Sequence, residues 1–401
     1  MVQLALFRLP DFRRLGASIF LSSLGMVGET VVVGWLTLEL TNSPFMVSAA
    51  LSMRMLPLFF IGVPAGALAD QVPRPRLLMA AGFGQALAAS TLAIVVLLGM
   101  VTVAHVMLVT LAAGIFRGVE QAARQSYAHD VVGPAALVSG LAVLGVGMRS
   151  GGLVGSLVVG AVIARFGSGA AYLVVALGFL GSALVLMRAM APPRTRSGAT
   201  SSVWRSTVEF LGALRRDRRL LVLMMLTAGA EILGFAHQAL LPSLARDILH
   251  TGPAGLGVLT AARSVGGILG LLGASARGGI GGGALFLAVL FGFGAGLIAL
   301  GAAPYVVGFA GVFVVVTLVN AMGGLADLLA QSLLQLSVPK ELRGRAGGAW
   351  VVAIGLAPLG QLQIGALASL FGVSIALGTS GLALVILASA TSLLFPRLKR
   401  I

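Results

Sequence analysis

Long hydrophobic runs without a charged residue alternate with short charged stretches along the whole chain. Three of these runs, residues 77–116, 278–326 and 346–396, contain 40, 49 and 51 residues. A membrane-spanning helix needs about 20 mostly apolar residues. Each of the three runs therefore predicts two spans joined by a turn, and the shorter apolar runs predict one span each.

Turn signals inside the long runs, and charged or Pro/Gly-rich gaps elsewhere, divide the chain into twelve predicted spans. We expect the turns at residues 99–102, 301–304 and 371–372. The predicted spans cover residues 15–38, 45–69, 77–100, 104–126, 138–164, 168–190, 220–242, 253–275, 283–302, 305–331, 345–370 and 373–395. Because lipid forces each segment to close its own backbone hydrogen bonds, and because the runs are too long for barrel strands, we predict an all-α membrane protein.

The composition excludes several classes of protein. Hydrophobic residues make up 58% of the chain and charged residues 10%, whereas a soluble domain carries about 25% charged residues. Without cysteine there are no disulfides or thiolate metal sites, and the four histidines lack zinc-site spacing. No H-E-x-x-H or P-loop motif is present. We therefore expect no metal, no cofactor and no enzymatic activity.

The basic charge of the chain follows its predicted topology. Lys and Arg outnumber Asp and Glu by 27 to 12, a formal net charge of +15. Of the 27 basic residues, 21 fall in the termini, in loops on one side of the predicted membrane or at the span ends next to those loops, and the loops of the opposite side hold two. Basic loops face the cytoplasm. We therefore expect a multi-pass protein of the plasma (inner) membrane, with both termini cytoplasmic and no nucleic-acid partner.

The N-terminal segment predicts a span and not a signal peptide. Arg8, Arg13 and Arg14 precede an apolar run of more than 20 residues. No short hydrophobic region with a small-residue cleavage site follows them. We therefore expect residues 15–38 to be retained as the first span.

The two halves of the sequence repeat at a nearly constant offset. Gly155 recurs 205 residues later as Gly360, and Arg54 recurs 209 residues later as Arg263. Further matches are Gly160 with Gly365 and Pro44 with Pro253. A nearly constant offset over a whole half indicates a duplicated unit.

The long polar stretch at residues 191–219 contains seven arginines and divides the chain near its midpoint. We therefore predict an N-terminal six-helix bundle at residues 1–190, a cytoplasmic linker at residues 191–219 and a C-terminal six-helix bundle at residues 220–401. Two parallel six-span repeats place a substrate cavity between them near the middle of the bilayer.

Four short motifs resemble those of the major facilitator superfamily. Residues 66–76, GALADQVPRPR, are similar to its G-x-L-A-D-x-x-x-R-x-R loop, and residues 54–57, RMLP, resemble the R-x-L-P of its drug-efflux and siderophore-exporter branch. Residues 117–121, RGVEQ, resemble the R-x-x-Q-G motif of proton-driven exporters. Residues 339–345, PKELRGR, resemble a P-x-E-x-R-G-R segment of the same branch. The resemblance covers essentially the whole chain.

Two positions depart from the exporter pattern. Exporters of this family often carry G-P-x-x-G-G in span 5, whereas residues 155–160 are GSLVVG, and Glu120 replaces the glutamine of the span 4 motif. The resemblance implies a monomer with two pseudo-symmetric six-helix bundles that rock between two states. It further implies secondary active transport, with proton-coupled efflux of an amphipathic, drug-like or siderophore-like small molecule. The departures leave proton symport, uniport for uptake and lipid flipping as alternatives.

Ionisable residues inside the spans are candidates for the transport pathway. Facing lipid, each would cost roughly 2.5–3.5 kcal/mol at a helix centre, so we expect them to face one another or water. The eight residues are Glu29, Arg54, Arg117, Glu120, Arg149, Glu231, Arg263 and Asp327. His237, Gln238 and Trp35 are further candidates to line the cavity.

These charged residues predict a proton and substrate pathway. Glu29, Glu120 or Glu231 binds the coupling proton, and Arg117 and Arg149 tune its proton affinity or hold an anionic group. Asp327, near the cytoplasmic end of its span, completes the predicted pathway. Arg117 and Glu120 are three residues apart and can pair on one helix face. The alternative is a set of static ion pairs that only fix the packing.

The loop of residues 66–76 predicts a separate site. Its candidate residues are Gly66, Asp70, Arg74 and Arg76. The loop is too short to reach a cavity at mid-membrane. The resemblance implies a cytoplasmic gate, in which the aspartate meets the positive N-terminal end of span 11 and neighbouring arginines. The alternative is a loop whose positive charge only sets the topology.

Overall fold

The described part of the chain is helical throughout. The computed structural model describes residues 6–57, 60, 71–133, 136–189, 218–276, 282–337, 353–396 and 398, and no strand occurs among them. Nine helices in these ranges are long and apolar enough to cross a membrane. The prediction of an all-α membrane protein is confirmed, and the count of twelve spans remains a prediction.

The chain forms two compact units. The first comprises the described residues within Met1–Asn42, Met53–Ser197 and Thr251–Ala261. The second comprises those within Ser43–Ser52, Gly198–His250 and Ala262–Ile401. Each unit therefore includes a short segment from the other half of the sequence.

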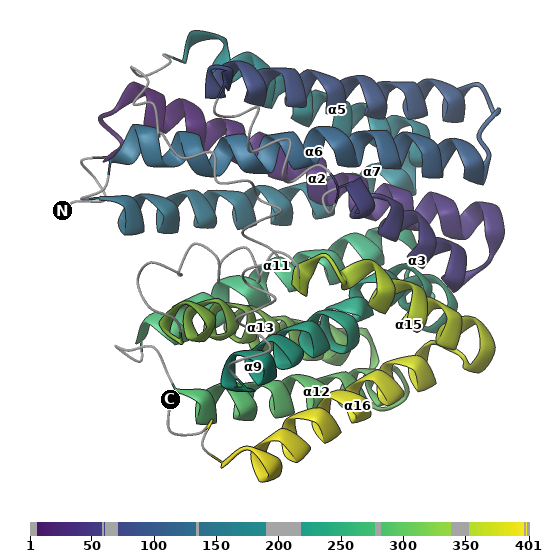
Figure 1. Cartoon of the computed structure of the whole chain (residues 1–401). Helices are drawn as coiled ribbons and strands as arrows, with labels where there is room; N and C mark the ends of the chain where they lie inside the picture. Colours follow the sequence, from purple (N-terminus) through teal and green to yellow (C-terminus); the bar gives the residue numbers. More distant parts are fainter. Residues whose placement is uncertain are drawn as a thin grey trace. The chain divides into compact units, whose positions relative to one another are not determined.

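Four long helices build most of the first unit (Figure 1). They are α2 (Pro10–Thr41), α5 (Arg74–Leu97), α6 (Val103–Val132) and α7 (Leu137–Val185). α2 packs along α7, and α5 packs against both α6 and α7. Because lipid is as apolar as the helix surfaces, close packing and interhelical hydrogen bonds hold such helices together. One such bond joins Ser18 of α2 to Ser182 of α7, with 2.8 Å between the hydroxyl oxygens.

Glycines in the left-handed backbone region make the turns of the first unit. α5 ends at Leu97 and Gly99 has a φ of +70°, so the turn predicted at residues 99–102 is confirmed. The Thr102 hydroxyl then caps α6 by accepting a hydrogen bond from the His105 N–H. α7 is interrupted at Gly167, where φ is +79°. The predicted division between residues 164 and 168 is therefore confirmed as well.

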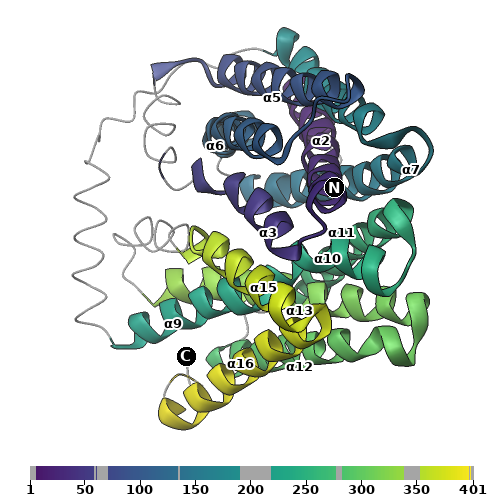
Figure 2. The same ribbon diagram turned by 90° about the vertical axis from the view of Figure 1, so that its right-hand side faces the viewer.

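The second unit contains α12 (Gly283–Val306), α13 (Gly308–Leu336), α15 (Ala357–Phe371) and α16 (Val373–Leu394). α12 lies beside α16 in both ribbon views (Figures 1 and 2) and also packs against α13. The short helix α3 (Pro44–Met53) packs on α15 through a hydrogen bond from the Ser52 hydroxyl to the Pro358 carbonyl, 3.3 Å long. α11 (Gly252–Ala276) contributes its first ten residues to the first unit and the others to the second.

One predicted turn in the second unit was wrong. The sequence places it at residues 301–304, but α12 continues through Pro304 to Val306, and the chain turns at Gly308 with a φ of +61°. Gly301 has a different role, since a Cβ there would lie 2.7 Å from the Ser374 carbonyl oxygen. It is a contact glycine between α12 and α16, whereas the reversal needs the positive φ of Gly308.

The helix at the start of the second unit changes type repeatedly. α9 (Arg218–Gly229) is followed by a π-helical turn, η2 (Ala230–Gly234), and a 3₁₀ segment, η3 (Phe235–Leu240). After α10 (Leu241–Ser243) a second π-helical turn follows, η4 (Leu244–Ile248). Such irregular segments leave backbone groups to be satisfied by side chains and are frequent at functional sites.

The sequence repeat is matched by a repeated packing contact. At Gly155 of α7 an added Cβ would overlap the carbonyl oxygen of Leu24 in α2. At Gly360 of α15 it would overlap the carbonyl oxygen of Ile232 in η2. The two glycines are 205 residues apart and their partners 208. In both units glycine lets two backbones touch.

A second pair of helix contacts also recurs in the two units. A Cβ on Gly160 would lie 2.8 Å from the Cα of Gly257, within the first unit. A Cβ on Gly365 would overlap the hydroxyl of Ser48, within the second unit. Ser48 and Gly257 are 209 residues apart, the offset that also relates Pro44 to Pro253. Equivalent small residues therefore make equivalent helix crossings.

Candidate functional site

Three charged side chains from separate elements meet inside the first unit. Glu29 lies in α2, Arg54 directly follows α3, and Arg117 lies in α6. Glu29 and Arg54 are buried, and 3.6 Å separates Oε2 of Glu29 from Nε of Arg54. Arg54 donates a hydrogen bond through Nη1 to the Thr30 hydroxyl. The Glu29 carboxylate interacts electrostatically with both arginines. The structure thus brings together two of the predicted pathway residues, Glu29 and Arg117, with Arg54.

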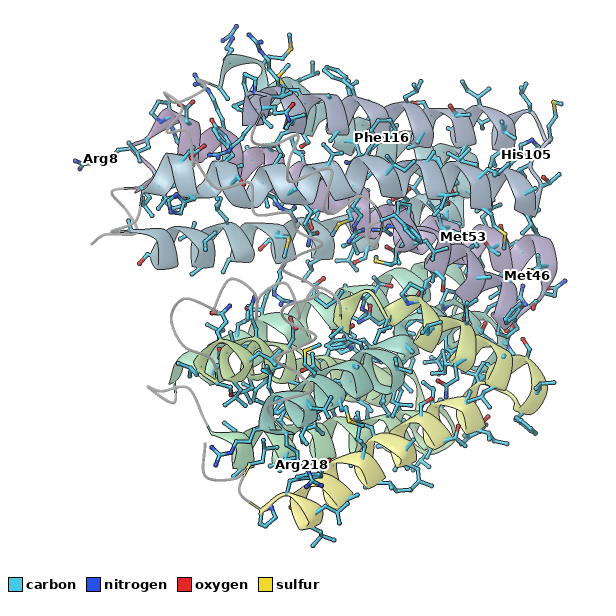
Figure 3. All side chains as sticks on the ribbon, viewed as in Figure 1. Arg8, Met46, Met53, His105, Phe116 and Arg218 are labelled. Atoms are coloured by element: carbon cyan, nitrogen blue, oxygen red, sulfur yellow. The ribbon has the colours of Figure 1, made fainter. Side chains whose placement is uncertain are left out.

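The residues next to Arg117 show where this cluster lies along α6. Figure 3 shows Phe116, the residue before Arg117, near the middle of α6 and away from His105 at one end of that helix. Gly84 of α5 packs on the Phe116 ring, which fixes the rotation of α6 at this level. Arg117 is therefore held far from either end of α6.

The Glu29–Arg54 contact is longer than two more exposed ion pairs among the described residues. Arg14 and Asp11 are 2.8 Å apart, and Arg246 and Asp247 are 2.6 Å apart. Charge-assisted hydrogen bonds between arginine and carboxylate are usually about 2.7–2.9 Å long and often come in parallel pairs. At 3.6 Å the Glu29–Arg54 contact is an electrostatic interaction and not a direct hydrogen bond.

The predicted pair between Arg117 and Glu120 is not formed. Oε1 of Glu120 accepts a hydrogen bond from Ser22, 2.6 Å long, and lies 3.5 Å from Arg124. Oε2 of Glu120 accepts a hydrogen bond from Gln85, 2.9 Å long. The prediction was wrong because spacing along one helix cannot show donors that α2 and α5 bring to the same carboxylate. Glu120 is thus a satisfied residue that ties three helices together.

A second pair of predicted residues meets in the second unit. Glu231 is buried at the start of the π-helical turn η2 and interacts electrostatically with Asp327 of α13. Within the described ranges no residue donates a hydrogen bond to Glu231. Arg149 lies half-buried in α7 of the first unit. The predicted pathway residues are therefore divided between the two units.

The second unit also holds a neutral network that the sequence did not predict. Nδ1 of His237 donates to the Gly234 carbonyl at 2.7 Å, so the proton of the neutral ring is on Nδ1. Nε2 then accepts a hydrogen bond from Nδ2 of Asn320, 3.3 Å away. Gly234 ends the π-helical turn, so the histidine satisfies a carbonyl in the irregular segment. Asn320 has no motif in the sequence that could have identified it.

This network occupies the positions that correspond to the charged cluster of the first unit. His237 follows Glu29 by 208 residues, and Arg263 follows Arg54 by 209. Arg263 donates a hydrogen bond to Gln238, and Arg54 donates one to Thr30. Thr30 and Gln238 are themselves corresponding positions of the repeat. Both units thus keep the hydrogen bond donated by the arginine. At the position of Glu29, however, the second unit has the neutral His237.

Replacing Asn320 with alanine is expected to lower the free energy of unfolding by about 1–3 kcal/mol, because the buried Nε2 of His237 loses its donor. Thermal unfolding of the purified protein in detergent measures this effect. Ser374→Ala is the matched control, since it removes an exposed hydrogen bond to Tyr305 in the same unit. Equal losses for the two variants would contradict the role assigned to the network.

The predicted gate is described in part. Gly66 and Asp70 lie outside the described residues, as does the 339–345 segment. Arg74, at the start of α5, bonds the carboxylate of Asp130 near the end of α6. Arg76 lies exposed two residues further along α5. Asp130 was missed because its contact with Arg74 depends on how two helices pack and not on any sequence motif.

The chain matches a protein family over almost its full length. The model of the family described as "Transmembrane secretion effector", a group of the major facilitator superfamily, matches residues 1–400. No curated protein matches the sequence significantly.

Solved transporter structures share the fold. A mutant of the nucleoside transporter NupG superposes with a TM-score of 0.78 at 14% sequence identity, covering 96% of this chain and 100% of that one. A bacterial homologue of the human lysosomal transporter Spinster, in an inward-facing conformation, gives a TM-score of 0.75 at 13% identity, with 98% of each chain covered. The peptide transporter POT gives 0.75 at 14% identity, covering 97% and 95%. At this identity the similarity establishes the fold.

Proposed function

The chain belongs to the transmembrane secretion effector family of the major facilitator superfamily, and on this basis we propose that it exports an amphipathic small molecule in exchange for protons. Membership in this family makes it a multi-pass membrane transporter and not an enzyme. Export is supported by the family description and by the exporter-like motifs at residues 54–57 and 117–121. The substrate and the protons would cross in turn as the two six-span halves expose a shared cavity to opposite sides.

Glu231 carries the proposal of proton coupling. It is a buried carboxylate at a π-helical turn, with Asp327 as its charged neighbour and no hydrogen-bond donor among the described residues. Burying a charge without a partner is costly, and a second carboxylate nearby adds repulsion. A bound cation relieves both costs, and the smallest cation that a carboxylate takes is a proton.

Glu29 has a different proposed role from Glu231. Its carboxylate interacts electrostatically with two guanidinium groups, so we propose it as the counter-charge that allows Arg54 and Arg117 to be inside the membrane. Glu120 is tied to Ser22, Gln85 and Arg124, which favours a structural role for it.

The cytoplasmic gate and the membrane topology are also proposals. We place the termini and the loop with Asp70, Arg74 and Arg76 on the cytoplasmic side, as the distribution of basic residues predicts. The Arg74–Asp130 contact supports a latch at that side, because it connects the gate loop to α6. Asp70→Asn is then expected to slow turnover while substrate affinity stays the same.

Flux measurements on proteoliposomes with an imposed pH gradient test the proposed function. Dyes and siderophores serve as substrates, and an entrapped pH indicator reports proton movement. Proton flow opposite to the substrate is the expected result. Proton flow in the same direction would show symport, and transport without proton flow would show uniport; either outcome contradicts exchange.

A further inference from the structure

Arg117 is a half-buried cation with two buried donor atoms that make no hydrogen bond to the described residues. These are its Nε and Nη1 atoms, which no acceptor of the described ranges reaches. An arginine has five N–H donors in a planar fork. Leaving donors of a charged group unsatisfied away from water costs more than leaving those of a neutral group. A ligand at Arg117 would remove this cost.

The nearby acceptors are already engaged elsewhere. Glu120, the residue that the sequence offers as a partner, is occupied by Ser22, Gln85 and Arg124. Glu29 stays closer to Arg54 and contacts Arg117 only through the longer-range electrostatic interaction. The described part of the first unit therefore supplies no oxygen that accepts a hydrogen bond from Nε or Nη1 of Arg117.

The charged groups around Arg117 have an excess of positive charge. Three guanidinium groups, those of Arg54, Arg117 and Arg124, interact here with two carboxylates, those of Glu29 and Glu120. One negative charge would neutralise this group of five. Because a guanidinium fork matches the two oxygens of a carboxylate or phosphate, an oxyanion fits both the charge and the free donors.

We propose that Arg117 anchors the anionic headgroup, a carboxylate or phosphate, of the amphipathic molecule that the protein transports. The proposal names the substrate class for the proposed transport function and rests on it. The headgroup takes the Nε and Nη1 donors of Arg117, and Glu29 competes with it for the same positive charge. The proton site at Glu231 belongs to the other unit, so anion and proton do not share a side chain.

Equilibrium binding to the full-length protein tests this assignment. The purified chain is placed in nanodiscs of zwitterionic lipid, and titration calorimetry compares 1-naphthoate with its neutral analogue 1-naphthamide. Wild type is expected to bind naphthoate at least about tenfold more tightly, as a buried charge-assisted contact provides. Equal affinity for the two probes would overturn the proposal.

Three variants assign the effect to the side chain. Arg117→Gln is expected to erase the preference for naphthoate, and Arg117→Lys, a point charge without the fork, to keep a reduced preference. Arg246→Gln is the matched control, because that arginine already pairs with Asp247. A naphthoate preference that survives Arg117→Gln, or that is lost equally in Arg246→Gln, would contradict the assignment.

A change at Glu29 provides a signature that a merely structural arginine would not give. Glu29→Gln removes the competing negative charge and is expected to tighten naphthoate binding about three- to tenfold while leaving naphthamide binding unchanged. Unchanged or weaker naphthoate binding in this variant would contradict competition at Arg117.

Two more probes identify the kind of anion. 1-Naphthyl phosphate is expected to bind as naphthoate does, and inorganic phosphate about tenfold or more weakly because it lacks the apolar part. Inorganic phosphate binding as tightly as naphthyl phosphate would overturn the amphipathic substrate. Added phosphatidylglycerol that displaces naphthoate would support the site with a lipid headgroup as its ligand, and no displacement would support a soluble amphiphile.

The outcome is separable from that of the proposed function. Binding at equilibrium needs no pH gradient. Loss of the anion preference together with intact proton-driven flux would overturn this inference alone. Intact anion binding without proton-driven flux would overturn only proton exchange.

Discussion

Glu231→Gln is expected to abolish substrate accumulation driven by a pH gradient. One proton that crosses two pH units contributes about 2.7 kcal/mol, which sustains a substrate gradient of about 100-fold. Glutamine has nearly the same shape as glutamate but binds no proton. In this variant the substrate is therefore expected to reach equal concentrations on the two sides and not to accumulate, while movement down the substrate's own concentration gradient continues.

The measurement is substrate accumulation in proteoliposomes with and without the gradient. Asp247→Asn is the matched control, because this exposed carboxylate lies in the same irregular helix and pairs with Arg246. Full gradient-driven accumulation in Glu231→Gln would show that the proton binds elsewhere. Glu29→Gln then becomes the next variant to measure, since Glu29 is the other buried carboxylate without a hydrogen-bond donor among the described residues.

Gly155→Leu is expected to prevent recovery of folded protein, and Gly155→Ala to lower the free energy of unfolding by about 1–3 kcal/mol. The reason is steric: any Cβ at this position overlaps the carbonyl oxygen of Leu24, and neither backbone can move without separating α2 from α7. Leucine adds three further carbons to the same overlap. Expression level, monodispersity and thermal unfolding in detergent measure the effect.

A glycine on the same helix provides the control. A methyl group added at Gly145 of α7 would have no neighbouring atom within 4 Å, so Gly145→Ala is expected to be neutral or to stabilise the helix by about 0.5–1 kcal/mol. Gly360→Ala is expected to resemble Gly155→Ala, because its Cβ would meet the Ile232 carbonyl. Stable Gly155→Ala protein, or a Gly145→Ala variant that is equally damaged, would argue against this helix crossing.

Much of the fold follows from hydrophobic patterning, since lipid leaves few alternatives to the helix. The turns at Gly99, Gly167 and Gly372 were predictable because glycine takes a positive φ at little cost. The turn at residues 301–304 was not, because Gly301 and Gly308 look alike in the sequence while only one of them lies at a reversal. What distinguishes them is α16, which packs against Gly301.

For the candidate site, too, some properties follow from the sequence and others only from the tertiary structure. The sequence alone determined that the chain is an α-helical membrane protein, that its halves repeat, and which residues carry charge inside the spans, because those properties depend on composition and spacing. Tertiary structure decided which charges are satisfied. Glu120 accepts hydrogen bonds from Ser22 and Gln85 of two other helices, and Nε and Nη1 of Arg117 have no acceptor in the part of the chain that the structure describes. It also identified Asn320 and Asp130, because a hydrogen bond between residues far apart in sequence depends on how their helices pack.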